Sequence, residues 1–154
     1  MTDPSPGGTP ARGVRISHVF DASRETVFAA WTDPDQVVRW WRPDGFEIPR
    51  DTVLIEPRVG GRFHLTMVDL ADEASYPFRA EILELEEPEV IVLKAEPIPE
   101  AGIMAATITR VVFEAEGQRT RMTVTDEPYA DEMRGNVEAG WLSLVANLDT
   151  LLAS

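Results

Sequence analysis

Few side chains in this sequence have the chemistry of a catalytic or metal-binding group. The chain contains no cysteine, which excludes disulfides, thiolate metal sites and cysteine nucleophiles. With His18 and His64 as the two histidines, a histidine-rich metal site is not expected. The patterns G-x-S-x-G, H-E-x-x-H, G-x-G-x-x-G and the P-loop are also missing. We therefore assign no catalytic residue, no metal site and no cofactor, and expect binding rather than catalysis.

His18 is the titratable group that the pattern places nearest to a core. Residues 14–20 alternate between apolar and polar, so His18 shares a strand face with Ile16 and Phe20 that should point inward. It is then either a hydrogen-bonded core residue or the titratable polar group of a pocket. Paired with a carboxylate in a dry pocket, it would serve proton transfer. His64 is expected to face solvent.

Composition limits the class of protein and its partners. The 154 residues suit one domain, and 44% apolar with 27% charged residues is the composition of an ordinary globular protein. A net charge of −13 should repel nucleic acids and anionic membranes. No apolar run could span a membrane or serve as a signal peptide, so we expect a cytoplasmic protein. Residues 1–13, rich in proline and glycine, are expected to form a flexible tail before a single domain at 14–154.

Two short helices should follow the first strand. Asp21 and Ser23 offer N-cap oxygens to a helix that ends before Pro34. Pro34 can open the second helix, with Asp33 as its cap. Six more strands are then expected, separated by turns such as Gly60-Gly61 and 116–118. We place these strands at 52–58, 62–67, 78–86, 90–95, 103–115 and 119–126.

The chain should end in one long amphipathic helix at 131–154. Its apolar residues recur at three- and four-residue steps: Val137, Trp141, Leu144, Val145, Leu148, Leu151 and Leu152. Gly140 lies inside this helix, where glycine lowers helix stability by roughly 1 kcal/mol relative to alanine. Close approach of another backbone or of a ligand would offset this loss. Strands segregated from helices indicate an α+β fold, a curved antiparallel sheet of about seven strands wrapped around this helix.

Four separated motifs occur in the order found in a known family. They are FDASRETVFAAWTDPDQVVRWW at 20–41, the Gly60-Gly61-x-Phe63 turn, Leu83-Glu84 ahead of Pro88, and Gly140-Trp141 leading into Val145, Leu148 and Leu152. The sequence thus resembles the activator-of-Hsp90-ATPase homologue family of the START-like, Bet v 1-like (SRPBCC) superfamily over about residues 14–153. The resemblance implies a helix-grip fold with a largely apolar pocket between the concave sheet face and the last helix. Members of the superfamily bind lipids, sterols, polyketides or plant hormones. The co-chaperone activity in the family's name belongs to longer eukaryotic proteins.

Ten residues are candidates for the walls of such a pocket: Trp40, Trp41, Phe46, Phe63, Leu65, Met67, Phe78, Met104, Trp141 and His18. The competing interpretation of the large apolar side chains is a solid core, and we expect Trp31 to be core. Thr107 and Thr109 would offer hydroxyls to a ligand if they face inward. Trp141 should contact the concave face near Phe63 and Leu65.

Trp40 and Trp41 are neighbours, and on a helix neighbouring side chains diverge by about 100°. We expect one of them in the core. The other should lie at the pocket mouth beside Phe46, where it would stack on a flat ligand.

The favoured function is non-catalytic binding of a small hydrophobic or amphipathic molecule. A first rival is a protein-interaction module, co-chaperone-like, that docks a partner through the last helix and its acidic loops. A second rival is a cyclase- or isomerase-like enzyme that uses the same pocket. An exposed edge strand would allow a homodimer.

Overall fold

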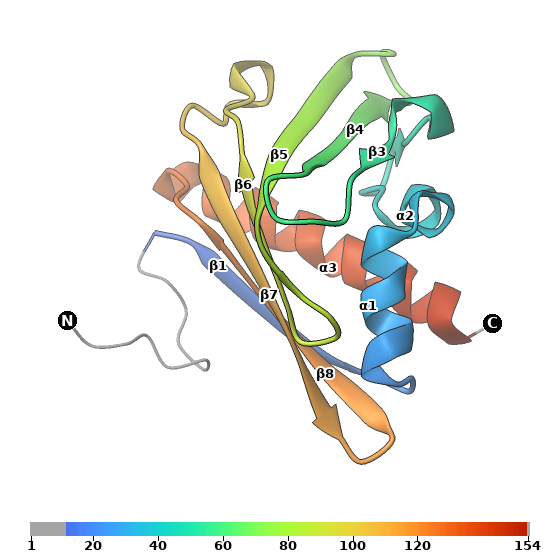
Figure 1. Ribbon diagram of the computed structural model, residues 1–154. Coiled ribbons are helices and arrows are strands. Elements are labelled where there is room, and N and C mark those ends of the chain that lie inside the picture. Colours follow the sequence, from blue (N-terminus) through green and yellow to red (C-terminus); the bar gives the residue numbers. More distant parts are fainter. Residues whose placement is uncertain (1–11, 154) are drawn as a thin grey trace.

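A curled antiparallel sheet packs one face against the long C-terminal helix (Figure 1). The computed structural model describes residues 12–153, so most of the tail expected at 1–13 lies outside the described residues. The strands are β1 (Val14–Phe20), β2 (Phe46–Glu47), β3 (Leu54–Ile55), β4 (Arg62–Asp69), β5 (Ser75–Glu86), β6 (Val90–Ala95), β7 (Thr107–Glu116) and β8 (Arg119–Glu127). The helices are α1 (Arg24–Thr32), α2 (Pro34–Trp40) and α3 (Asp131–Ala153), with short 3₁₀ turns η1 (Arg50–Thr52) and η2 (Pro99–Ala101).

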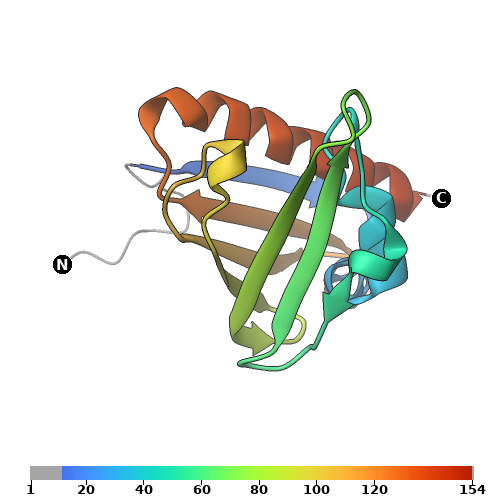
Figure 2. The same ribbon diagram turned by 90° about the horizontal axis from the view of Figure 1, so that it is seen from above.

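Within residues 12–153 the sheet has eight strands in the order β1-β8-β7-β6-β5-β4-β2, and β3 pairs with β4. Viewed from above, α3 lies along one side of the sheet, and α1 and α2 lie beside the C-terminal half of α3 (Figure 2). The predicted α+β helix-grip architecture is confirmed. The sheet exceeds the predicted count by the two-residue β2.

Two predicted strands are shorter than expected. Of residues 52–58, only Leu54 and Ile55 pair with β4, because the preceding residues turn into η1 and Pro57 has no N–H to donate. The strand expected at 103–115 begins at Thr107. Ile103 instead pairs with Ile98 across η2, through backbone bonds of 2.8 and 3.0 Å.

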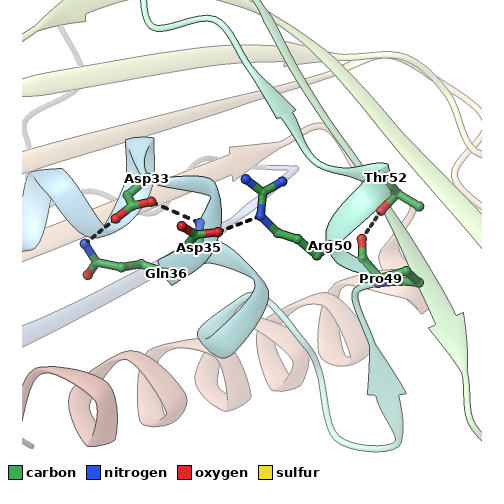
Figure 3. Close-up of polar contacts among 6 residues, drawn as sticks. All are labelled: Asp33, Asp35, Gln36, Pro49, Arg50 and Thr52. Carbon is green, nitrogen blue, oxygen red and sulfur yellow. Dashed lines mark hydrogen bonds and ion pairs between the residues drawn. The ribbon is translucent and has the colours of Figure 1, made fainter.

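The start of α2 is held by the caps that the sequence predicts. The Asp33 carboxylate accepts hydrogen bonds from the backbone N–H of Asp35 at 3.0 Å and the side chain of Gln36 at 3.1 Å (Figure 3). Arg50 of η1 donates to the Asp35 carboxylate at 2.7 Å, which joins α2 to the segment before β3. These contacts hold the start of α2, about one and a half turns before the tryptophans at its C-terminus.

All four tryptophans of the chain pack in one cluster under α3. Trp31 of α1 is fully buried and contacts Trp40, Trp41 and Trp141, with ring centroids 4.9, 5.5 and 6.1 Å away. Its indole N–H donates to the sulfur of Met122 on β8 at 3.3 Å. The prediction that Trp31 is core is confirmed, and this side chain joins both short helices, the sheet and α3.

Asn147 ties α3 to the end of α2. Its side-chain amide donates to the carbonyl oxygens of Trp40 at 3.3 Å and Arg42 at 2.9 Å.

None of the helices in the described range is long and apolar enough to cross a membrane.

The cluster predicts a large energetic asymmetry between two side-chain truncations. Trp31→Ala should lower the free energy of unfolding by about 3–5 kcal/mol, because it leaves a cavity shared by three helices and the sheet. Leu142→Ala on the exposed side of α3, where Leu142 is 53% exposed, should change it by less than about 0.5 kcal/mol. Urea unfolding of both variants checks this, and equal losses would contradict it.

Candidate functional site

A cavity of about 200 Å³ lies between α3 and the concave face of the sheet. It is lined by Trp41, Pro43, Met67, Phe78, Ala95, Glu96, Ile98, Ile103, Thr107, Asp126, Tyr129, Val137, Gly140, Trp141 and Leu144. The sheet supplies one wall, α3 the opposite wall, and the segments after α2 and around η2 line the rest of a cavity that is partly open to solvent. The site is therefore assembled from parts of the chain that are distant in sequence.

The α3 wall follows from helical spacing. Val137, Gly140, Trp141 and Leu144 are at positions i, i+3, i+4 and i+7, which place them on one face of the helix. A Cβ added at Gly140 would meet no heavy atom within 4 Å. The expectation that another backbone closely approaches Gly140 is therefore wrong. This glycine instead leaves room in the wall.

The aromatic wall is built around Trp41. Its ring lies 5.2 Å from Phe78, 5.6 Å from Trp141 and 5.4 Å from Phe63, measured between centroids. Trp41 is the C-cap of α2 with φ −81° and ψ 61°, so it has left the helical conformation. Trp40, one residue earlier, is fully buried and donates its indole N–H to the carbonyl of Ala30 at 2.8 Å.

The two neighbouring tryptophans divide as predicted, one into the core and one into the cavity wall, but they do not diverge as on a continuous helix. Both rings contact Trp31, because the 100° divergence of an ideal helix does not apply once Trp41 has left it. Trp40 is core and Trp41 lines the cavity, but the partner of Phe46 is Tyr76, 6.2 Å away. The predicted position of this tryptophan beside Phe46 is wrong, and its stacking on a flat ligand stays a prediction.

A buried carboxyl lies in the cavity wall. Asp126 near the end of β8 is 4% exposed and accepts three hydrogen bonds. Thr109 donates to its Oδ1 at 3.0 Å, while the Tyr129 hydroxyl at 2.7 Å and the Trp141 indole N–H at 2.9 Å both donate to its Oδ2. The acid thus joins β7, the start of the segment before α3, and α3 itself.

Burial raises the pKa of both the Asp126 carboxyl and the Tyr129 phenol. Loss of water raises the pKa of the Asp126 carboxyl above its usual 3.8, although the three donated hydrogen bonds act in the opposite direction. Burial, followed by the charge of Asp126, also raises the pKa of the Tyr129 phenol. Tyr129 therefore remains a neutral donor to the acid, while the acid is easier to protonate than an exposed aspartate.

Asp126 did not stand out among the candidates from the sequence. Its alternation with Met122 and Val124 on β8 is the signal that would have pointed it inward. Thr107 and Thr109 do face inward and are buried, Thr107 in the cavity wall and Thr109 behind Asp126.

The structure brings four of the ten predicted pocket residues into the cavity wall: Trp41, Met67, Phe78 and Trp141. Phe63 and Leu65 are on the concave face but belong to the buried core. Trp141 is connected to Phe63 through the ring of Trp41, and its own polar contact is with Asp126.

Three predicted pocket residues, Phe46, Met104 and His18, lie outside both the cavity wall and the buried core. Met104 is 74% exposed because β7 begins only at Thr107, and it lines an adjoining hollow that shares Ile103 and Tyr129 with the cavity. His18 is on the inward face of β1, but β1 is an edge strand and the imidazole reaches out to Asp149 of α3 at 3.3 Å. With its side chain 38% exposed, His18 is not the polar group of the pocket. His64, expected to face solvent, is half-buried, and burial lowers its pKa.

Among residues 12–153, no group of three or more histidine, aspartate or glutamate side chains is arranged to hold a metal ion.

Comparisons with known proteins agree on the fold. The model of the family described as Activator of Hsp90 ATPase homolog 1-like protein matches residues 21–153. Comparison with curated proteins finds no match.

Solved structures resemble the chain over nearly its whole length. A crystal structure of a protein from Chromobacterium violaceum has a TM-score of 0.85 at 23% identity and covers 94% of this chain and 99% of that one. The AHSA1 protein from Silicibacter pomeroyi has a TM-score of 0.76 at 22% identity, and the match covers 92% of this chain and 97% of that one. An AHSA1-like protein from Aeromonas hydrophila has a TM-score of 0.71 at 21% identity, and the match covers 89% of this chain and 90% of that one. At these identities the likeness shows the fold alone.

The raised pKa of Asp126 predicts a pH dependence of stability. Between the unfolded pKa and the raised folded one, the folded state holds a proton that the unfolded state has lost, so stability falls as pH rises through this window. Asp126→Asn removes the titratable carboxyl, so the variant lacks this contribution to the pH dependence. The stability of the wild type relative to Asp126→Asn should therefore decrease from pH 4 to pH 8, with a slope of at most about 1.4 kcal/mol per pH unit. Urea unfolding across this range measures the difference, and a constant difference would contradict the prediction.

Proposed function

Because this chain belongs to the family of Activator of Hsp90 ATPase homolog 1-like proteins, we propose that it acts through its helix-grip cavity as a non-catalytic binder of a small amphipathic molecule. The observation that carries the proposal is a partly open apolar cavity with one hydrogen-bonded acid, Asp126, in its wall. Ligand sites of proteins share this composition, mostly apolar lining with a few placed polar groups.

The size of the cavity limits the ligand. Its volume of about 200 Å³ is slightly larger than the roughly 150 Å³ that accommodates benzene in an engineered apolar cavity. A single ring with a short substituent fits this space. Sterols and other fused-ring ligands would require α3 to move away from the sheet.

The chemistry of the lining favours a ligand with two unlike ends. Trp41, Phe78 and Trp141 offer broad apolar surfaces on which a flat ring would pack. Asp126, with Tyr129 and Thr107 close by, offers the polar contacts that would orient the other end. A ligand of this kind stabilises the folded state by mass action.

Two glycines of α3 allow a matched test. Gly140 lines the cavity, whereas Gly135 lies on α3 outside it, and at both positions an added Cβ would meet no heavy atom within 4 Å. A single-ring ligand at about 100 times its Kd should raise the Tm of the wild type by about 5–10 °C. Gly140→Leu should abolish most of this rise, because its side chain occupies the ligand's space, while Gly135→Leu should preserve it.

The ligand itself is found by native mass spectrometry of the protein purified from its own host and by a thermal-shift screen of single-ring amphipathic compounds. Both leucine variants gain similar helix propensity, so their Tm values without ligand serve as the baseline. Equal ligand responses in both variants would remove the cavity as the binding site. A wild type with no copurifying compound and no thermal shift would contradict the proposed function.

A further inference from the structure

The charges that line the cavity are of one sign. Asp126 is buried in its wall and Glu96 is exposed at its rim, and the described lining includes no lysine, arginine or histidine. We propose, resting on the function proposed above, that the occupant is an organic cation: a small ring that carries an amine or an alkylated ammonium.

Within the part of the chain that the structure describes, no cationic side chain contacts the Asp126 carboxyl. Its hydrogen-bond partners Thr109, Tyr129 and Trp141 are neutral donors, and the charged neighbour that influences it is Glu127, of the same sign. A buried carboxylate without a cation is costly, because hydrogen bonds replace only part of its lost hydration. A cation in the cavity would supply the missing charge.

The hydrogen-bond capacity of Asp126 leaves a position for such a ligand. A carboxylate offers about four acceptor positions, two on each oxygen. Among residues 12–153, Oδ2 accepts from Tyr129 and Trp141, while Oδ1 accepts from Thr109. One position on Oδ1 therefore remains for an N–H of the ligand, and in the empty protein a proton can take that place.

The aromatic wall suits a cation as well. Trp41 packs between Phe78 and Trp141, with ring centroids 5.2 and 5.6 Å away, and all three rings line the cavity together with the acid. Ring faces attract cations through their quadrupole, tryptophan most strongly, and the attraction grows when water is excluded. Aromatic rings next to a buried acid form a combination that distinguishes an ammonium ion from a neutral group of the same shape.

Three probes of similar size separate charge from shape. Benzylamine is cationic at neutral pH, ethylbenzene is its neutral counterpart, and benzoate is anionic. Titration of the wild-type protein, followed by tryptophan fluorescence and by NMR, should show that benzylamine binds at least about tenfold more tightly than ethylbenzene. Benzoate should bind more weakly than both, because its carboxylate would lose hydration in a lining whose described residues include no cation, and Glu96 at the rim repels it.

Variants attribute the preference to the acid. Asp126→Asn should weaken the affinity for benzylamine at least about tenfold, while the affinity for ethylbenzene should change by no more than about twofold. Asp21→Asn, an exposed acid outside the cavity lining, should leave both unchanged. Should Asp126→Asn fail to fold, the wild-type ratio still decides, and Glu96→Gln at the exposed rim should lower that ratio by about two- to threefold.

The outcomes distinguish this inference from the function beneath it. Equal affinity for benzylamine and ethylbenzene would overturn the cation preference and leave apolar binding intact. A stronger affinity for benzoate would also overturn it. If neither benzylamine nor ethylbenzene binds, both the cation preference and the single-ring binding function are overturned.

Discussion

The hydrogen bond between the Trp141 indole and the Asp126 carboxyl is the contact on which the arrangement of α3 depends. A buried indole N–H needs an acceptor and a buried carboxyl needs donors, so each side chain removes a cost that the other would otherwise carry. The bond spans 2.9 Å between β8 and the middle of α3. Together with the buried face of α3 and the Asn147 contacts to the end of α2, it sets how the helix lies against the sheet.

The tryptophan cluster extends this constraint to the rest of the molecule. Trp31 contacts the other three indoles, and Trp41 continues the contacts to the aromatic side chains of β4 and β5. Large rigid rings pack well against one another but rarely fill a curved space completely. The missing side chain at Gly140 removes one more filler from the α3 wall. A cavity with an aromatic wall is thus the consequence of how the helix is anchored.

The same anchoring gives the cavity its polarity. The acid that orients α3 also lines the space under it, so the structural role of Asp126 and the role proposed for it in binding use one group. Relatives with this fold at 21–23% identity share the architecture, but a fold by itself does not specify a ligand. Specificity must come from the particular residues that face the cavity, here three aromatic rings and an acid with no cation in the described lining.

The sequence by itself determined most of the elements and their order, because alternation, helical spacing and capping residues are local patterns that short-range physics enforces. The apolar stripe of α3, the caps at Ser23 and Asp33 and the alternation of β4 were all legible in this way. Only the tertiary structure decided that Trp41 and not Trp40 lines the cavity, since that choice depends on where α2 ends against α3. It also decided that His18 reaches the outside at a sheet edge and that Asp126 finds its donors on three different segments. These features depend on the curl of the sheet and the path of α3 across it, which bring together residues that no local pattern connects.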